Sequence, residues 1–422
     1  VVDAWGGSLT LTAEDDIAIS LLRSSATVMV ASASGGIVDA DGGAGADINR
    51  DGSAVLLSAT GVGSANALET EIDNLEATGG TGAVRIANTG DLVVGGIGAT
   101  VGVSARNNVI DLSAASSITV SETIDSNGGA VTLDATTDVN INAAILSDGG
   151  AVTVNADNNI NFNAAGSIDT EAGSTATVTI AADDDTNGAG RITMADGSVV
   201  DAWGGNLTLT AEDDIAIGLL RSSATVTVSS ASGGIVDADG AAGADINRDG
   251  SAVLLSATGV GSANALETEI DNFEATGGAV VFPAGNLGPD PTTIGSPSNR
   301  ISSPVNIWAT GNIDGNTPGF PLRPSSSRGP SSCDSLTIKP EAVAPGTNVR
   351  APVPGGYDLK SGTSMAAPHV AGVIALLMEA FPERTGTEIK LALLATTMDL
   401  GVPGEDNDYG MGLINAGHAY EY

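Results

Sequence analysis

One serine in this chain lies at the expected start of a helix, a position that suits a nucleophile. Ser364 lies in the string SGTSMAAPHVAG at residues 361–372, between a glycine-containing turn and the apolar run 370–380, which predicts a helix. The first N–H groups of a helix have no acceptors within it, and the helix dipole favours negative charge there. Both properties suit an oxyanion that forms beside an attacking hydroxyl. The position therefore suits a nucleophile in acyl transfer, although for a serine in isolation a simple helix cap is the favoured interpretation.

The wider string resembles a family signature. Residues 362–372, GTSMAAPHVAG, are similar to the nucleophile motif of subtilisin-like serine proteases, the subtilases, and most similar to the secreted bacillopeptidase F type. Four further segments match family motifs in the family's order: PAGNLGP at 283–289, SSSRGP at 325–330, KPEAVAPG at 339–346 and YGMGLINA at 409–416. The resemblance implies a serine endopeptidase that acts on polypeptides, with Ser364 as nucleophile. It also implies that Asn286 donates its side-chain amide to the oxyanion, beside the Ser364 N–H.

The family's catalytic aspartate and histidine have no counterpart in this sequence. The family places both before the oxyanion asparagine, yet no D-T-G-type or H-G-T-H-V-type segment precedes Asn286. Only two histidines occur, His369 and His418. Five helical residues turn the chain by about 500°, so His369 diverges from Ser364 and is expected to be a packed structural histidine. His418 is expected on a helix surface, and we therefore expect no meaningful peptidase activity from this chain as written.

Composition divides the chain into two regions near Gly278. Residues 1–278 carry 38 acidic and 7 basic side chains and no proline, whereas residues 279–422 carry 13 acidic, 8 basic and all 16 prolines. We expect an acidic repeat region over 1–278 and a truncated subtilase catalytic domain over 279–422. The resemblance implies that the second region is a partial α/β doubly wound domain that lacks about half of its sheet. Uncovered strands and an exposed apolar face would make such a remnant prone to aggregate.

The acidic region repeats itself at two lengths. The long unit at residues 1–80 recurs at 199–278 with six differences, and Gly-Gly pairs at 128–129 and 149–150 open successive shorter units. Within these units apolar and polar residues alternate, which predicts strands with one buried face. Strands this short bury their apolar face only by stacking, so we predict a parallel β-solenoid of roughly a dozen coils, with a β-sandwich array as the alternative. The repeat style resembles filamentous-haemagglutinin-like bacterial surface proteins.

A motif of calcium-binding loops occurs once in each long repeat. The string DINRDG begins at Asp47 and again at Asp245, and it matches the D-x-N-x-D-G opening of a calcium-binding loop. Its twelfth position is serine rather than glutamate, and Asp39 and Asp41 could supplement the ligands. An Asx-rich turn between coils is the alternative. The predicted ligands are Asp47, Asn49, Asp51, Asp245, Asn247 and Asp249.

Charge and composition limit the partners and the compartment. The net charge of −36 argues against nucleic acid, because phosphate binding needs a positive surface. The single cysteine allows no internal disulfide, and neither a signal peptide nor an apolar run long enough to span a bilayer is recognised. Extracellular or bacterial cell-surface location follows from both resemblances. No motif indicates a partner for the repeat region.

Three functional interpretations remain open from the sequence alone. The first is a subtilase fragment whose parent hydrolyses peptide bonds. The second is a non-enzymatic surface or adhesin-like repeat protein with an incidental tail. The third is an erroneous joining of two coding segments, since Gly-Gly-Ala-Val occurs at 128–131 and 149–152 and again at 277–280, across the change in composition.

Overall fold

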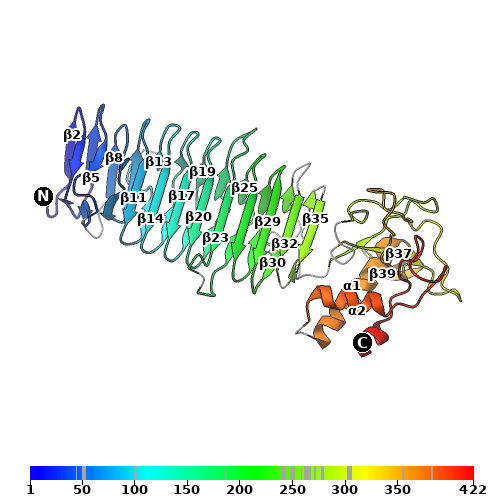
Figure 1. Ribbon diagram of the computed structural model, residues 1–422. Coiled ribbons are helices and arrows are strands. Elements are labelled where there is room, and N and C mark those ends of the chain that lie inside the picture. The colour runs from blue at the N-terminus through cyan, green and yellow to red at the C-terminus, as the bar shows by residue number, and fades with distance from the viewer. Residues whose placement is uncertain are drawn as a thin grey trace. The chain divides into compact units, whose positions relative to one another are not determined.

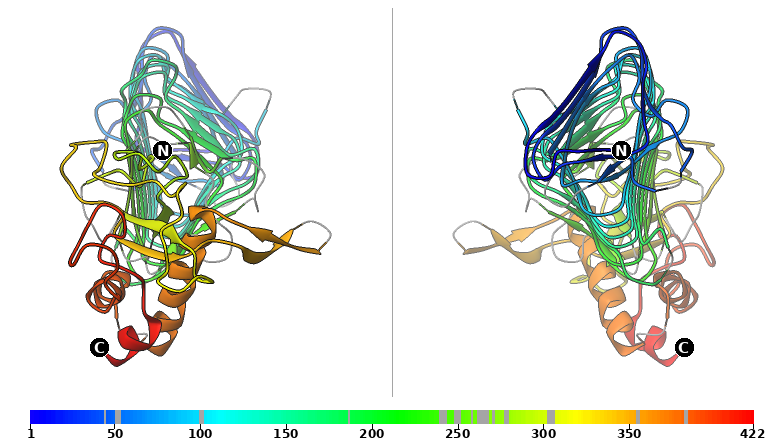
Figure 2. Two further views of the ribbon diagram at one scale, coloured as in Figure 1. Left: turned by 90° about the vertical axis from the view of Figure 1, so that its right-hand side faces the viewer. Right: turned by 90° about the vertical axis from the view of Figure 1, so that its left-hand side faces the viewer.

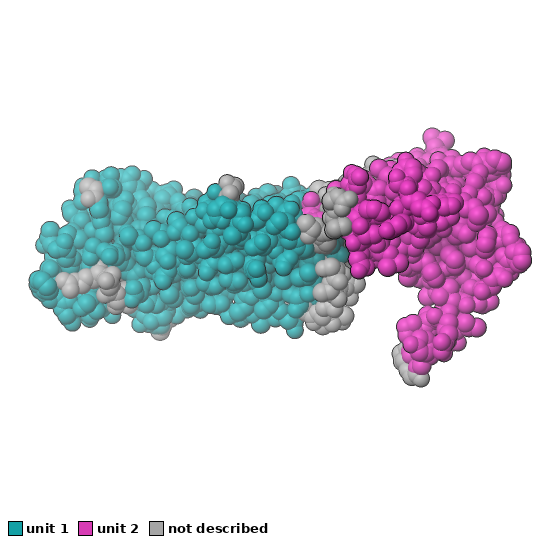
Figure 3. All heavy atoms as spheres, turned by 90° about the horizontal axis from the view of Figure 1, so that it is seen from below, with its two compact units in different colours: residues 1–252, 260–270 teal, residues 253–259, 271–422 magenta. Residues whose placement is uncertain are grey.

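The computed structural model describes most of the chain and divides it into two compact units. Unit 1 comprises residues 1–252 and 260–270, and unit 2 comprises residues 253–259 and 271–422 (Figure 3). The described residues are 1–43, 45–49, 54–98, 102–185, 187–238, 244–247, 252–257, 259–260, 268–269, 272–276, 280–301, 307–353, 356–381 and 384–422. Gly278, where the sequence predicts a domain boundary, lies outside these ranges, so that boundary stays a prediction.

Parallel strands dominate the N-terminal part of the chain and form three ladders (Figure 1). The first is a 13-stranded sheet: β1 (Val2–Asp3), β4 (Leu22–Arg23), β7 (Ile48–Asn49), β9 (Leu68–Glu71), β11 (Val84–Asn88), β14 (Ile110–Ala114), β17 (Val131–Ala135), β20 (Val152–Ala156), β23 (Val178–Ala182), β26 (Leu207–Ala211), β29 (Thr225–Ser230), β32 (Ala252–Ser256) and β35 (Asn272–Thr276).

The second and third ladders diverge at β10 (Asn74–Thr78), which pairs with both. The second contains β2 (Leu9–Ala13), β5 (Val28–Ser32), β8 (Ala54–Ser58), β10, β12 (Leu92–Val94), β15 (Ile118–Val120), β18 (Val139–Ile141), β21 (Ile160–Phe162), β24 (Ile192–Met194), β27 (Ile215–Ile217), β30 (Gly234–Asp237) and β33 (Gly259–Val260). The third continues through β13 (Val103–Ser104), β16 (Ile124–Asp125), β19 (Ala144–Leu146), β22 (Ser167–Asp169), β25 (Val199–Asp201), β28 (Leu219–Arg221), β31 (Ile246–Asn247) and β34 (Thr268–Glu269). A short separate pair joins β3 (Ile17–Ile19) to β6 (Ile37–Asp39).

The period-two pattern of the sequence explains which side of each strand is buried. In β17 the side chains of Val131, Leu133 and Ala135 are buried, whereas Thr132 and Asp134 are not, as predicted. Val131 pairs with Val152 of the next short unit, so apolar residues of successive layers lie on one another. Seen along the stack, the strands of successive layers superimpose (Figure 2). Their buried apolar side chains form the core of unit 1.

The second glycine of the pairs at 128–129 and 149–150 is required by the close stacking of successive layers. A Cβ on Gly150 would lie 1.8 Å from the carbonyl oxygen of Gly129, and a Cβ on Gly129 would lie 1.9 Å from that of Asn108. Both contacts are with backbone, which has no free side-chain end that could move aside. The buried Ser147 hydroxyl donates a 2.6 Å hydrogen bond to the Gly150 carbonyl and so closes the same corner.

Unit 2 contains a small parallel sheet with helices packed on it, which is an α/β arrangement. Its strands follow the order β36 (Val281–Pro283), β37 (Trp308–Ile313), β38 (Ala342–Pro345), and an antiparallel hairpin joins β39 (Val349–Val353) to β40 (Gly356–Lys360). The helices are α1 (Thr363–Ala380), α2 (Gly386–Ala395) and α3 (Ala416–Glu421).

The two faces of the small sheet are covered differently. Trp308 packs in one core with residues of all three helices, whereas the next residue, Ala309, packs with Ala284 and Ile294 from the loop after β36. Successive residues of a strand face opposite sides, so these clusters lie on opposite faces. The described helices therefore share one face, and the doubly wound arrangement stays a prediction.

Helix α1 departs from the expectation of no membrane-spanning run. Its 18 residues make it, within the described part of the chain, the one helix long and apolar enough to cross a bilayer. A helix in the core of a folded domain has the same length and composition. Ala366, Val370, Ile374 and Leu377 of α1 are buried in the core around Trp308, so packing within unit 2 accounts for the apolar residues on that side of α1.

Candidate active site

Ser364 is the second residue of α1 and its side chain is exposed. The helix begins at Thr363, after Gly362, and Gly362 has no side chain that could cap it. Within the described ranges the Ser364 N–H donates no hydrogen bond, as expected for the first turn of a helix. The hydroxyl and its own N–H are therefore both available to a ligand at the positive end of the helix dipole.

Asn286 lies against the start of the same helix. Its Oδ1 accepts a 3.0 Å hydrogen bond from the Thr363 N–H, so the asparagine caps the helix that carries Ser364. The Gly285 N–H in turn donates to the Thr363 hydroxyl over 3.2 Å. In the described structure the Asn286 Nδ2 donates no hydrogen bond, and its side chain is exposed. The fold thus brings two free donors, Asn286 Nδ2 and the Ser364 N–H, to one helix N-terminus.

The segment around residues 325–330 holds Asn286 in place. The Ser327 N–H donates to the Gly285 carbonyl over 2.9 Å, and the Ser327 hydroxyl accepts from the Leu287 N–H over 3.0 Å. Gly285 has a φ of +109°, and a Cβ there would lie 2.8 Å from the Ser327 hydroxyl oxygen. Glycine is therefore required immediately before the asparagine.

A buried ion pair lies just before β38 and anchors the start of that strand. Lys339 donates to the Ile307 carbonyl over 2.9 Å and pairs with Glu341, whose other oxygen accepts from the Ala309 N–H over 2.6 Å. Burial raises the pKa of Glu341, and the Lys339 ammonium opposes that rise. The pair joins β37 to the residues just before β38, which is a structural role.

Both histidines make their described contacts away from Ser364. The His369 Nδ1–H donates to the Met365 carbonyl over 2.8 Å within α1, and the ring is exposed rather than packed as expected. The reason is that His369 lies off the buried stripe of α1, which includes Val370 and Ile374. His418 is exposed in α3, as predicted. Within the described structure, no hydrogen bond joins either ring to Ser364.

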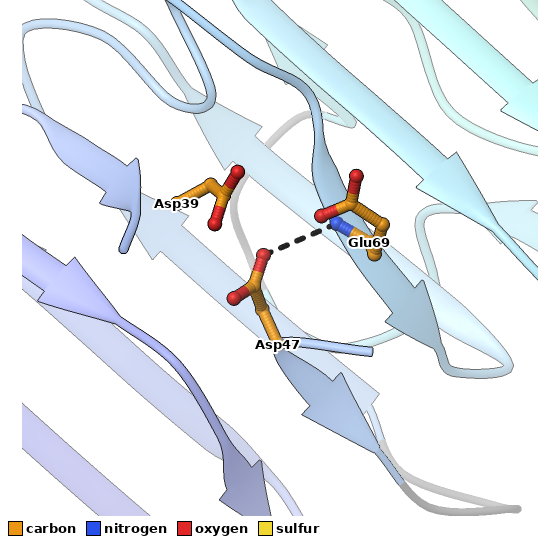
Figure 4. Close-up of side chains that lie close together, drawn as sticks. All are labelled: Asp39, Asp47 and Glu69. Atoms are coloured by element: carbon orange, nitrogen blue, oxygen red, sulfur yellow. Dashed lines mark hydrogen bonds between the residues drawn. The ribbon is translucent and has the colours of Figure 1, made fainter. Parts of the chain in front are cut away.

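Four of the six predicted calcium ligands, Asp47, Asn49, Asp245 and Asn247, lie among the described residues. Asp47 is fully buried and lies beside Asp39 and Glu69 (Figure 4). Asn49 instead donates its side-chain amide to Glu71 over 2.6 Å. In the second copy Asp245 is buried and Asn247 ends β31. Asp51 and Asp249 lie outside the described residues, so the loop motif stays a prediction.

The sequence did contain a signal for Glu69, which the motif analysis missed. Strand β7 pairs with β9 so that Ile48 lies opposite Thr70, which sets Asp47 beside Glu69 of the following layer. Acidic residues one short repeat unit apart are therefore neighbours in space. The role of Thr363 at the Asn286 contact had no comparable signal, because 77 residues separate the two.

Comparisons with known proteins agree on one family. The model described as "Subtilase family" (Peptidase_S8) matches residues 93–412, or 320 of 422 residues. Subtilisin DY from Bacillus licheniformis is 32% identical over 166 residues, which cover 39% of this chain and 54% of that protein. An extracellular serine protease from Serratia marcescens is 53% identical over 60 residues, 14% of this chain and 6% of that protein.

A plant protein is also similar to this chain. Subtilisin-like protease SBT3.16 from Arabidopsis thaliana is 40% identical over 105 residues, which cover 21% of this chain and 14% of that protein. This chain thus spans about half or less of the length of each of these relatives.

Proposed function

Because this chain belongs to the subtilase family of serine peptidases, we propose that its C-terminal unit carries the nucleophilic part of a site that hydrolyses peptide bonds. The observation that supports this proposal best is the Asn286 carboxamide capping the residue before Ser364 at 3.0 Å. That contact sets a side-chain donor next to the N–H of the nucleophile. The substrate of such a site is a polypeptide.

Each group has a definite part in the proposed chemistry. The Ser364 hydroxyl oxygen attacks the scissile carbonyl carbon, and the carbonyl oxygen gains the negative charge. The Ser364 N–H and Asn286 Nδ2 then hold that oxyanion, and together with the dipole of α1 they stabilise the tetrahedral intermediate. A base must take the proton from the Ser364 hydroxyl and pass it to the leaving amine. The amine then departs and leaves an acyl-serine, which water hydrolyses.

The proton of the Ser364 hydroxyl has no acceptor within the described site. Removing the histidine from a triad of this kind costs about as much rate as removing the whole triad, roughly 10⁶-fold. We therefore propose that these residues turn over no peptide by themselves. Turnover requires an imidazole supplied from outside the contacts described for Ser364.

Chemical rescue tests the proposed site. A fluorophosphonate probe is added with and without free imidazole, and the labelled residue is identified by peptide mass spectrometry. We expect slow labelling of Ser364 that imidazole accelerates and that Ser364→Ala abolishes. Asn286→Ala should reduce the accelerated rate by about 10²–10³-fold, as for loss of one oxyanion donor. Labelling spread over other serines, or unaffected by Asn286→Ala, would refute the assignment.

We further propose that unit 1 is a parallel β-solenoid that lies outside the cell. Three ladders of parallel strands, in which each strand pairs with its counterpart in the next short unit, support the solenoid. The name of the Serratia marcescens relative, an extracellular serine protease, supports the location. If peptide turnover is never found, a surface or adhesin-like role of the repeats is the second candidate, which the missing base favours.

A further inference from the structure

Three carboxylates of unit 1 converge on one small space. Asp39, Asp47 and Glu69 each offer an oxygen, and these oxygens all lie within 4.8 Å of one another. Their side chains point toward a common centre in Figure 4. Each residue also has one enclosed oxygen with no hydrogen-bond partner: Asp39 Oδ2, Asp47 Oδ1 and Glu69 Oε2. Buried polar atoms are nearly always paired, so three orphaned oxygens together require an explanation.

The backbone fixes the three side chains in this arrangement. Asp39 closes β6, and its Oδ1 accepts from the Asp41 and Gly42 N–H groups at 2.8 and 2.9 Å. Asp47 precedes β7 and donates its N–H to the Glu69 carbonyl over 2.7 Å, while the Glu69 N–H donates to Asp47 Oδ2 over 3.3 Å. These bonds hold Asp39 to its own turn and hold Asp47 against Glu69 of the following layer.

Electrostatics make this arrangement costly unless a cation is present. Asp47 is fully buried, and the carboxylate of Asp39 lies beside it. The other charged groups that act on Asp47 are Glu69 and Asp41, which are acidic as well. Like charges held this close in a desolvated space repel strongly. Nothing cationic among the described side chains offsets that repulsion.

We propose that Asp39, Asp47 and Glu69 bind one Ca²⁺ ion between the layers of unit 1. Calcium takes oxygen ligands at about 2.3–2.6 Å, so two oxygens on opposite sides of the ion are roughly 4.6–5.2 Å apart. The spacing of the three carboxylates fits that span. Main-chain carbonyls and water complete the usual shell of six to eight ligands. The ion joins three consecutive layers. The proposed calcium site does not depend on the proposed peptidase function.

The long repeat contains the same residues a second time. Asp237 and Asp245 correspond to Asp39 and Asp47, and both are buried. Glu267 corresponds to Glu69 in the sequence and lies outside the described residues. Substitutions in the first cluster leave the second copy intact, so they should change the number of bound ions by one.

Calcium titration of the full chain tests the proposal. The protein is stripped with a chelator and titrated with CaCl₂ by isothermal calorimetry, as wild type and as Asp47→Asn, Glu69→Gln and Glu71→Gln. Asp47→Asn keeps the side-chain shape and removes a buried charge, so it should fold. Glu71→Gln is the matched control, because it removes one charge from the same strand, two residues from Glu69, outside the cluster.

The expected result is specific to the cluster. Asp47→Asn and Glu69→Gln each bind one calcium ion fewer per chain than the wild type, and Glu71→Gln binds the same number. Without calcium, Asp47→Asn should melt at a higher temperature than the wild type, because the repulsion is relieved. The proposal is overturned if the wild type shows no saturable binding up to about 10 mM CaCl₂. It is overturned equally if Glu71→Gln loses the same ion.

The calcium experiment also checks for an internal counter-charge. Arg50 follows Asn49 in the sequence and lies outside the described residues. Arg50→Ala should bind as many calcium ions as the wild type and melt at the same temperature in their presence. A wild type that binds no calcium, together with an Arg50→Ala variant that melts well below it, would assign the counter-charge to the arginine and refute the calcium site.

Discussion

Asn286 divides two tasks between the two atoms of its carboxamide. Oδ1 caps the N-terminus of α1 through the Thr363 N–H, and Nδ2 stays free for an oxyanion. A substitution that keeps the acceptor but removes the donor should therefore separate folding from chemistry. Asparagine and aspartate differ in that way, and an aspartate also suits the positive end of a helix.

We predict that Asn286→Ala lowers the free energy of unfolding of unit 2 by about 1 kcal/mol, whereas Asn286→Asp leaves it nearly unchanged. Urea unfolding followed by Trp308 fluorescence, in a chain with Trp5 and Trp203 replaced by phenylalanine, measures the difference. Both variants should lose imidazole-accelerated probe labelling. If the aspartate variant unfolds as easily as the alanine variant, Oδ1 is not a cap.

The Lys339–Glu341 pair offers a second test at single residues. Lys339→Met leaves the buried Glu341 carboxylate without its partner and should cost about 3–5 kcal/mol of unfolding free energy. The double variant Lys339→Met with Glu341→Leu removes both charges and should recover much of that loss. Urea unfolding of the three chains measures the coupling. Additive losses in the double variant would show that the two side chains do not act as a pair.

Lys390 of α2 makes the stability of unit 2 depend on pH. Its side chain is fully buried, its ammonium has no partner among the described residues, and burial lowers its pKa to about 8, although the Glu341 charge acts to raise it. The folded-state pKa lies below the unfolded value, so below pH 8 the folded protein bears the full cost of a buried charge. Between about pH 8 and 10.5 the unfolded chain binds more protons, and stability rises with pH.

We therefore predict that Lys390→Met removes this rise and stabilises unit 2 at pH 7 by about 1–3 kcal/mol. Urea unfolding at pH 7 and pH 10, followed by Trp308 fluorescence, compares the variant with the wild type. A wild type whose stability is equal at the two pH values, or falls toward pH 10 in parallel with the variant, would mean that Lys390 is charged and solvated in the folded state.

Among the structural elements, the glycines at the corners of the stacked layers should differ most in how well they tolerate a side chain. Gly150 touches the backbone of the layer before it, whereas Gly7, its counterpart in the first layer, meets only the Ala4 carbonyl at 3.5 Å. We predict that Gly150→Ala forces two layers apart and destabilises unit 1 by several kcal/mol, as for overpacked core sites, while Gly7→Ala costs less than about 1 kcal/mol. Thermal melting followed by circular dichroism measures both. Equal effects would mean that stacking does not require the glycine.

The features of the fold and of the candidate site that could be predicted from the sequence are those that depend on a local pattern of residues. Alternation in 131–135 predicted which side chains of β17 are buried, because a strand's buried face depends only on period two. The start of α1 beside Ser364 followed from the turn and the apolar run. Contacts across layers or across unit 2 did not follow, because they depend on register. The contact of Asn286 with Thr363 is of this second kind, whereas the repeat length did carry a signal for the Asp47–Glu69 pairing.

At the scale of the whole molecule, charge is divided unequally. Residues 1–278 carry a net charge of −31 (38 acidic, 7 basic), and residues 279–422 carry −5 (13 acidic, 8 basic). Carboxylates on successive layers repeat close together, so the first region repels itself far more than the second. Salt that screens these charges should therefore act mainly on the first region.

Raising NaCl from about 0.01 M to about 1 M shortens the Debye length from about 30 Å to about 3 Å. In the presence of a chelator, which removes any bound calcium, we predict that this change raises the melting temperature of unit 1 by several degrees and that of unit 2 by much less. Two chains with a single tryptophan report the units separately, one keeping Trp203 and the other Trp308. If both transitions shift by the same amount, salt acts through general hydration, and repulsion among the repeats contributes little to stability.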